Sequence, residues 1–379
     1  MSVNNTHLSL WERSVPTFEE FSLFSWEEKL ETLAWLGHLA PSTHNTQPWR
    51  FFCKPETHSF IVALDRNFIL PESDIVGRQT IVSIGCVMEN IIVAAEALGL
   101  KPSIHYCDVT TEMVKPKKEK TIQPDIIAIA SIEFTEGAVN TEMIPLAQAI
   151  RTRKTMRVEF DPTKLVDKKI LDELTEKISV DSVDIHLVTD SLRRLSISEF
   201  QGQADGYVLN SPKFSRELGD WLLPNNTDAS IGMPGDTFGF DDVQALRISR
   251  GLRGEGVLEP EDMLRFSLGG KVGFEKSPVI AFFTIEKDDV RGWLSAGRAM
   301  ERAFLILERE QISFAIHAAI VEVRLINRIF AATLGTFKPL AAVFRLGYVK
   351  DEAMKLERPH SPRLSMSEIL LTQEPANMN

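Results

Sequence analysis

A cluster of basic and hydroxyl-bearing side chains lies near the middle of the chain. Residues 151–157 read RTRKTMR, so four cations and two hydroxyls fall within seven residues. Arginine presents a planar fork of donors that matches the oxygens of a phosphate, and a hydroxyl adds a neutral donor. In an extended segment alternate residues face one side, which would group Arg153, Thr155 and Arg157 and turn Lys154 away. The cluster predicts a one-sided anion cradle, although composition alone favours a solvated basic strand end.

A second candidate is the polar loop at residues 41–49, which reads PSTHNTQPW. Six consecutive residues in it carry hydrogen-bonding side chains: Ser42, Thr43, His44, Asn45, Thr46 and Gln47. Such donors and acceptors can bind the polar rim of a flat heterocycle. Before any resemblance is considered, an ordinary loop between a helix and a strand explains this sequence better.

Signatures of other enzyme classes do not fit. Residues 251–256, GLRGEG, lack the G-x-G-x-x-G order and follow no clear strand, which argues against a dinucleotide fingerprint. The sequence contains no G-x-S-x-G and no H-E-x-x-H, so it gives no support to a hydrolase or a zincin. His317 lies in the apolar run FAIHAAIV, which favours a core histidine over a catalytic base. The three cysteines form no C-x-x-C pair, so we predict neither a disulfide framework nor a metal site.

Composition limits the class of partner. The 379 residues include 53 acidic and 42 basic side chains, which gives a formal charge of −11. This acidity argues against a nucleic-acid or anionic-membrane partner and leaves small molecules. The most apolar stretch, residues 83–100, contains Glu89, Asn90 and Glu96, whereas a membrane span needs about 20 nearly uncharged residues. Because the first 20 residues also lack an apolar signal region, we expect a cytoplasmic protein.

The loop and the basic cluster lie between regular elements. Ser25 and Glu28 have capping-box spacing, so a helix is expected to begin there and to stop before Pro41. In the first half we expect strands at 51–53, 60–65, 103–106 and 126–134 and a long buried helix at 77–100. In the second half we expect helices at 145–151, 168–178, 192–209, 293–311 and 322–334, strands at 183–188, 279–285 and 340–348, and a loop-rich region at 211–274.

The two halves share a coarse pattern. The long helix at 77–100 precedes the strand at 126–134, and the helix at 293–311 precedes the strand at 340–348 in the same way. This pattern indicates a duplicated α+β unit within one chain.

The loop and the basic cluster together resemble those of a known family. Residues 41–51, PSTHNTQPWRF, resemble the PSxxNxQPWxF loop of the FMN-dependent nitroreductase superfamily, and residues 153–160, RKTMRVEF, resemble its RRSxRxF phosphate-binding segment. With further segments such as AGRAMERAF and SPRLSMSEIL, the resemblance spans most of residues 26–371 and is closest to the Acg-type subgroup of fused two-lobe proteins.

This resemblance implies an α+β, nitroreductase-like three-layer fold. Most relatives are homodimers with FMN between the subunits, so the fused lobes here would form a pseudo-dimer with one complete site, and further association into homo-oligomers stays open. The implied domains are an N-terminal extension at 1–24, a first lobe at 25–140 and a second lobe at 141–379, with a lid at 211–240.

Site residues follow from the resemblance position by position. Arg153 and Arg363 would bind the FMN phosphate, Thr155 would replace the family's serine, and Arg157 would lie near the pyrimidine end of the ring. The opposite lobe would contribute Ser42, Thr43, His44, Asn45 and Gln47. Two departures are visible: Ser361 stands where many relatives have lysine, and residues 316–319 replace a glycine-containing turn beside flavin N5.

The implied function is hydride transfer from NAD(P)H, through flavin N5, to a quinone-like or nitroaromatic acceptor. The cofactor carries this chemistry, so no catalytic side chain is assigned. The alternative is a protein that sequesters or stores flavin with little NAD(P)H turnover, which the expected lid and the altered turn both motivate.

Overall fold

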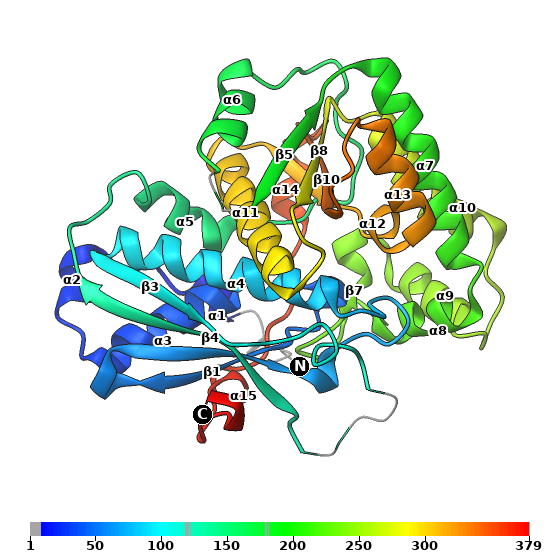
Figure 1. The fold of residues 1–379 in the computed structure, drawn as a ribbon. Helices are drawn as coiled ribbons and strands as arrows, with labels where there is room; N and C mark the ends of the chain where they lie inside the picture. Colours follow the sequence, from blue (N-terminus) through cyan, green and yellow to red (C-terminus); the bar gives the residue numbers. More distant parts are fainter. Residues whose placement is uncertain (1–8, 118–120, 122, 179, 181, 379) are drawn as a thin grey trace.

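The protein's computed structural model describes residues 9–378 except 118–120, 122, 179 and 181. In this part of the chain two four-stranded antiparallel sheets form the framework (Figure 1). The first sheet has the order β1-β2-β4-β3, with strands Trp49–Lys54, Ser59–Asp65, Ile126–Glu136 and Leu100–Tyr106. The second has the order β5-β8-β10-β9, with strands Val183–Val188, Val279–Ile285, Leu340–Gly347 and Ser313–Ile316. A short parallel pair, β6 (Leu222–Leu223) and β7 (Met233–Pro234), lies apart from both.

Burial along the strands follows their positions. The edge strand β3 alternates exposed residues with buried or half-buried ones, as expected where one face of a sheet is covered. The central strands β8 and β10 are buried at every residue. Helix α11 (Val290–Arg309) covers one face of the second sheet, and helices α7 (Ser191–Leu209), α10 (Pro260–Glu275) and α13 (Arg324–Thr333) lie over the other (Figure 1).

Two long helices join the sheets. Helix α4 (Arg78–Ala97) lies on the first sheet, α11 (Val290–Arg309) lies on the second, and the two pack against each other between the sheets (Figure 1). Their backbones touch at Gly85 and Gly297, because a Cβ built on Gly85 would lie 2.3 Å from the carbonyl oxygen of Leu294. Helix α4 is long and apolar enough to cross a membrane, but 94% of its apolar window is buried within the protein.

The two halves of the chain have the same order of elements. In the first, α3 (Trp26–His38) is followed by β1, β2, α4, β3 and β4. In the second, α6 (Lys168–Glu176) is followed by β5, β8, α11, β9 and β10. The second half also contains insertions, which are α7 (Ser191–Leu209), α8 (Pro212–Trp221), α9 (Asp242–Leu252), α10 (Pro260–Glu275), α12 (Ala319–Glu322) and α13 (Arg324–Thr333). Equivalent strands therefore occupy equivalent places in the two sheets.

The predicted start of the first long helix is confirmed. The Ser25 side chain accepts a hydrogen bond from the Glu28 backbone N–H, and the Glu28 carboxylate accepts one from the Ser25 N–H. Helix α3 ends at His38, before Pro41, and the β1–β2 hairpin follows as expected.

The loop-rich prediction for residues 211–274 is wrong, because α8, α9 and α10 lie there. Each helix begins with a start signal that outweighs the local glycine content. Ser211 caps α8, Asp241 and Gln244 form a capping box at α9, and Pro260 lies in the first turn of α10. The helix expected at 322–334 is divided between α12 and α13, and the short strand β9 was not predicted.

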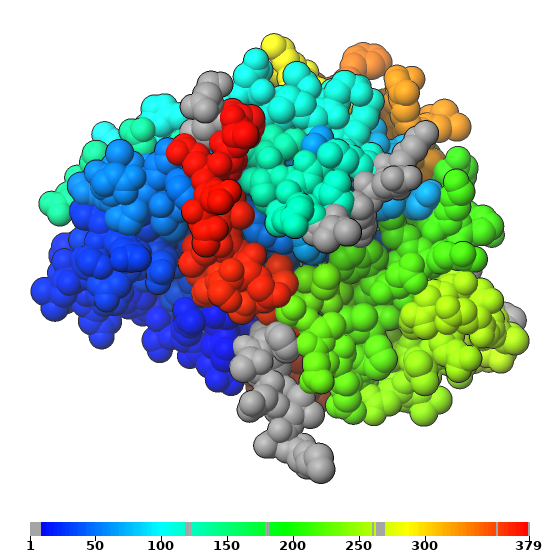
Figure 2. All heavy atoms as spheres, turned by 90° about the horizontal axis from the view of Figure 1, so that it is seen from below, coloured from blue at the N-terminus to red at the C-terminus, as the bar shows by residue number. Residues whose placement is uncertain are grey.

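The chain ends bind the two halves together. After α14 (Glu352–Glu357), the C-terminal tail crosses from the second half to the first, where Leu371 N–H donates to the Phe51 carbonyl at 2.7 Å. This tail, which contains α15 (Met366–Ile369), appears as a red band over the first half in Figure 2. Near the other end lie α1 (Ser9–Glu12) and α2 (Phe18–Ser22), and Trp11 stacks on His360 of the tail. Residues 1–8 of the expected extension lie outside the described residues.

Candidate functional site

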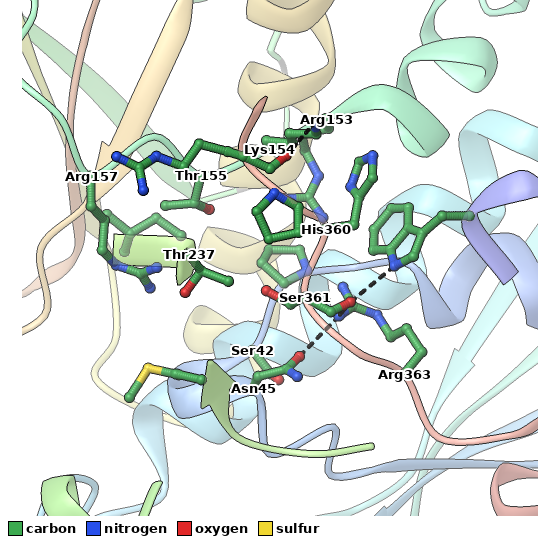
Figure 3. Close-up of a pocket in the computed structure, with 16 residues that line it drawn as sticks. Ser42, Asn45, Arg153, Lys154, Thr155, Arg157, Thr237, His360, Ser361 and Arg363 are labelled. Carbon is green, nitrogen blue, oxygen red and sulfur yellow. Dashed lines mark hydrogen bonds between the residues drawn. The ribbon is translucent and has the colours of Figure 1, made fainter. Parts of the chain in front are cut away.

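The polar loop and the basic cluster meet at one cavity (Figure 3). Its described lining includes five cations, which are Arg153, Lys154, Arg157, Arg358 and Arg363, and none of its 16 lining residues is acidic. Positive charge that surrounds a partly enclosed space favours an anionic ligand. We call this space the first cavity.

The basic segment runs past the cavity as an extended strand. It leaves helix α5 (Ile144–Thr152) at Arg153 and pairs with β9, where Thr155 forms a parallel bridge with Phe314. Met156 is buried in a small apolar cluster, whereas Arg153, Thr155 and Arg157 line the cavity. Met156 follows the expected alternation, but the expectation that Lys154 turns away is wrong, because Lys154 also lines the cavity. Its ammonium donates to the backbone carbonyls of Arg358 at 2.7 Å and Lys355 at 3.3 Å.

Two buried arginines converge on the C-terminal end of α3. Arg153 Nη2 donates to the Leu39 carbonyl at 2.8 Å, and Arg363 Nη2 donates to the carbonyls of Leu39 at 3.1 Å and Ala40 at 3.0 Å. The last carbonyls of a helix carry partial negative charge, which stabilises nearby cations. Burial, and then the charge of Arg153, lower the pKa of Arg363 to about 9. The Arg363 guanidinium therefore stays charged near neutral pH, and it lies close to that of Arg153, since both donate to the Leu39 carbonyl.

Arg157 differs from these two arginines because no described backbone carbonyl accepts a hydrogen bond from it. Its side chain is exposed toward the cavities, and its guanidinium lies 4.5 Å from the centre of the Phe238 ring. Among the described residues it has no hydrogen bond or ion pair. Desolvation by the surrounding protein lowers its pKa to about 10, so the group is charged at neutral pH. An unpaired cation in this position is available to a ligand.

The polar loop has an unusual backbone. His44, Asn45 and Gln47 have φ values of 50°, 56° and 51°, in the left-handed region that costs non-glycine residues about 1–3 kcal/mol each. Hydrogen bonds hold this conformation. Ser42 Oγ accepts from the Gln47 N–H at 3.0 Å, and the Gln47 side-chain amide donates to the Ser230 carbonyl at 2.7 Å and accepts from the Leu364 N–H at 2.9 Å.

Asn45 links three segments at the cavity wall. Its Nδ2 donates to the carbonyls of Gly232 and Pro362, both at 3.0 Å. Its Oδ1 accepts from Arg363 Nη1 at 2.9 Å. The loop, the segment around residue 232 and the tail are therefore fixed relative to one another.

The structure brings six of the nine predicted site residues to the first cavity, which are Ser42, Asn45, Arg153, Thr155, Arg157 and Arg363. The other three are not in its lining. Thr43 Oγ1 donates to Gln79 Oε1 at 3.4 Å, and Gln47 is buried in the loop's own hydrogen bonds. Burial, and then the charge of Arg157, lower the pKa of His44 to about 4, so this imidazole is neutral at pH 7.

A larger cavity adjoins the first, and Arg157 and Ile316 line both. We call it the second cavity. Phe238 and Phe240 form part of its wall, with ring planes 5° apart. His317, which the sequence suggested as a core residue, lies at this wall and accepts a hydrogen bond from Arg345 Nε at 3.1 Å. Burial, and then Arg345, lower its pKa well below the usual value, so the ring is neutral.

Several lining residues were not identified from the sequence: Trp11, Met233, Thr237, Arg358, Pro359 and His360. They come from the N-terminal helix, from residues 233–240 and from the start of the tail. Arg358 Nη1 donates to the Asp236 carbonyl at 2.7 Å, so the tail and residues 233–240 reach the cavity together. Only tertiary packing brings these segments together, and no local motif marks them.

Comparisons with known proteins identify the fold. No family model matches the sequence. The Mycobacterium tuberculosis protein named "Putative NAD(P)H nitroreductase acg" is 24% identical over 332 residues, which covers 87% of this chain and 91% of the relative. An uncharacterized protein of the same organism is 28% identical over 225 residues and covers 59% of this chain and 60% of its own length.

A solved structure agrees with this similarity. The structure from Anabaena variabilis, described as a "putative nitroreductase", superposes with a TM-score of 0.50 at 10% identity and covers 91% of each chain. The expected α+β, nitroreductase-like fold is therefore confirmed. We conclude that this chain has the fold of the nitroreductase superfamily. Its sequence is similar over most of its length to a protein whose name is that of an NAD(P)H nitroreductase.

Proposed function

We propose that the chain is an FMN-binding oxidoreductase that takes hydride from NAD(P)H and passes it to a quinone-like or nitroaromatic acceptor. One observation carries the proposal. Segments more than 100 residues apart meet around a cavity with five cations and no acidic residue in its described lining. A larger cavity with an aromatic wall adjoins it.

The donors at the first cavity suit a phosphate monoester. Arginine forks and a hydroxyl are the groups that phosphate oxygens accept from. Arg153 and Arg363 supply fixed charge, and the Thr155 hydroxyl has no hydrogen bond among the described residues. FMN combines a phosphate with a flat ring system, so its two ends match the basic first cavity and the aromatic second cavity.

The remaining residues receive supporting roles in this proposal. FMN, when bound, supplies a ring that accepts and passes on hydride. Arg157 would place positive charge beside the ring, and Ser42 and Asn45 would contact FMN from the opposite side. Thr43, His44 and Gln47 would hold the strained loop. No side chain is assigned as an acid or base.

We also propose that the two halves form a pseudo-dimer from a duplicated unit, with lobes at 25–140 and 141–379, as in the Acg-type subgroup. The matching strand orders of the two sheets support this division. The contact of α4 with α11 at Gly85 and Gly297 joins equivalent helices. Each chain would then carry one complete FMN site.

A flavin-sequestering role is the second candidate, and the segment 230–240 favours it. Residues of this segment line both cavities, and Asn45, Gln47 and Arg358 donate hydrogen bonds to its carbonyls. A segment held in this way could act as the lid we placed at 211–240. In the altered turn at 316–319, the backbone N–H of His317 donates to the Val343 carbonyl at 3.0 Å. This N–H would therefore not be available to flavin N5.

Two measurements test the proposal. Purified chain is dialysed against FMN and its absorbance spectrum is recorded, and we expect a stoichiometric flavin band. The loaded protein is then mixed anaerobically with NADH or NADPH in a stopped-flow instrument. Rapid bleaching supports the oxidoreductase, and a persistent band with tightly bound FMN supports sequestration. If no FMN is retained, both candidates fail.

A further inference from the structure

Two residues on helix α7, both in the lining of the second cavity, have acceptor oxygens without a described partner. Gln201 Nε2 donates to Asp205 Oδ1 at 2.8 Å. The remaining oxygens of the pair, Gln201 Oε1 and Asp205 Oδ2, are buried and have no hydrogen-bond partner among the residues that the structure describes. Gln201 is only 1% exposed, so solvent contributes little. Residues four apart project from the same face of a helix, so the two free oxygens belong to one polar patch.

The described cations in the cavity wall do not neutralise this patch. Arg345, in the same cavity wall, donates to His317 Nε2 and to the Val158 carbonyl, and Lys350 pairs with Glu159 at 3.2 Å. Burial, which outweighs the hydrogen bond from Gln201, raises the pKa of Asp205 to about 7. Buried acceptors without donors are costly, so their presence in a cavity wall indicates a bound group that supplies the donors.

The opposite helix is shaped to admit the carboxyl group. Gly270 of α10 lies in the same cavity lining, and a Cβ at that position would lie 2.0 Å from Asp205 Oδ2. Any side chain there would displace the carboxyl group. The carboxyl therefore occupies space that only a glycine leaves open.

We propose that Asp205 and Gln201 form a subsite in the second cavity that binds a nitrogen group with two N–H donors, an amidinium or a primary carboxamide, on a small molecule. Two neighbouring acceptors match two N–H bonds of one such group. An ionised Asp205 would favour the cationic form, because a charge-assisted hydrogen bond is stronger than a neutral one. The subsite rests on the proposed function only in one respect, that the small molecule is the electron acceptor.

Four nitroaromatic probes of one shape test the subsite: 4-nitrobenzamidine, 4-nitrobenzamide, methyl 4-nitrobenzoate and 4-nitrobenzoate. Equilibrium binding is measured by calorimetry at pH 8, where Asp205 is mostly ionised, with and without added FMN. We expect the amidine to bind about tenfold or more tighter than the ester, with the amide between them and the benzoate weakest. Because binding is read without NAD(P)H, the result stands even if flavin turnover fails.

Matched variants assign the effect to the patch. Asp205→Asn is expected to weaken amidine binding about tenfold and to change ester binding less than about twofold. Glu199→Gln makes the same chemical change on the same helix, at a carboxylate that pairs with Lys271 at 2.6 Å, and should leave all four affinities unchanged. Equal affinities for the four probes, or an equal loss of all four in Asp205→Asn, would overturn the proposal. Loss of FMN retention alone would count against the function and not against the subsite.

Discussion

At the scale of single residues, the candidate site has more positive than negative charge, and backbone carbonyls help to stabilise it. Arg153 and Arg363 are both 3% exposed, and backbone carbonyls at the end of α3 stabilise them. The nearest described carboxylate is Glu301, whose Oε1 lies 3.1 Å from Arg153 Nε. One buried carboxylate beside two buried arginines leaves net positive charge, which an anionic ligand would neutralise.

Arg153 and Lys154 are neighbours in sequence but should differ in their effect on FMN binding. Arg153→Ala removes a fixed charge at the cavity wall, and a charged hydrogen bond contributes about 1.5–3 kcal/mol, so the Kd for FMN should rise about 10–100-fold. Lys154→Ala removes an ammonium that backbone carbonyls already bind, and we expect a smaller loss. Fluorescence titration with FMN measures both variants, after thermal unfolding has shown that each is folded. Equal losses would contradict the orientation described here.

Glu301 should make stability depend on pH. Burial, which outweighs the attraction of Arg153, raises its pKa to about 7 from 4.5. The folded state then binds the proton of Glu301 more tightly than the unfolded state does. The contribution of Glu301 to the free energy of unfolding is therefore greatest below pH 4.5 and is lost as pH rises to about 7. The loss amounts to at most about 3 kcal/mol. Glu301→Gln removes this contribution, so the fall in Tm between pH 5 and 8 should be smaller in the variant. A variant with the same or a steeper fall would show that Glu301 is ionised throughout.

At the scale of elements, the contact of α4 with α11 sets how closely the two halves approach. Gly85 and Gly297 leave no room for side chains, because a Cβ on Gly297 would lie 2.0 Å from the Val82 carbonyl oxygen. Backbone atoms cannot move aside as a flexible side chain can. The two glycines are therefore a packing requirement of the helix pair.

Gly85→Ala should destabilise the protein. Forcing a methyl group against the backbone of α11 typically costs about 1–3 kcal/mol, and we expect a lower Tm and a lower denaturant midpoint. The matched control is Gly206→Ala in α7, where a Cβ meets nothing within 4 Å. That substitution should be neutral or stabilising by up to about 1 kcal/mol, because alanine has the higher helix propensity. If both variants unfold at the same midpoint, close backbone contact does not limit the packing of α4 on α11.

Local signals in the sequence predicted most elements, and long-range contacts account for what was missed. The capping box at Ser25 and Glu28 correctly placed the start of α3, and the helices expected at 77–100 and 293–311 correspond to α4 and α11. The glycine content of 211–274 predicted loops there. Three helices lie in this region, and their start signals at Ser211, Asp241 and Pro260 are also local features of the sequence. The predicted loop and basic cluster do meet at a cavity. Its other lining residues, such as Trp11 and Arg358, carry no local signal, because only the folded chain brings them there.

At the scale of the whole molecule, one chain contains both sides of the candidate site. The polar loop lies between α3 and β1 of the first half, and the basic segment runs beside β9 of the second. The C-terminal tail crosses back and places Arg363 between them, with its guanidinium bonded to Asn45 at 2.9 Å. A site at the interface of a symmetric homodimer takes its two sides from different subunits. In this chain the polar loop and the basic segment belong to one polypeptide, so the geometry of the site does not depend on protein concentration.

Complementation between variants tests this intramolecular arrangement. One chain carries Asn45→Ala and another carries Arg153→Ala, and the two are co-expressed with different affinity tags and purified through both tags or as a mixture. If each chain forms its own site, every site contains one of the two substitutions, so FMN titration should show only weakened binding. If sites form between chains, each mixed dimer has one site that contains both substitutions and one that contains neither, and a fraction of sites would recover the affinity of the unsubstituted protein. Recovery of that tight-binding fraction would contradict the pseudo-dimer, because the polar loop of one chain and the basic segment of another would then form one FMN site.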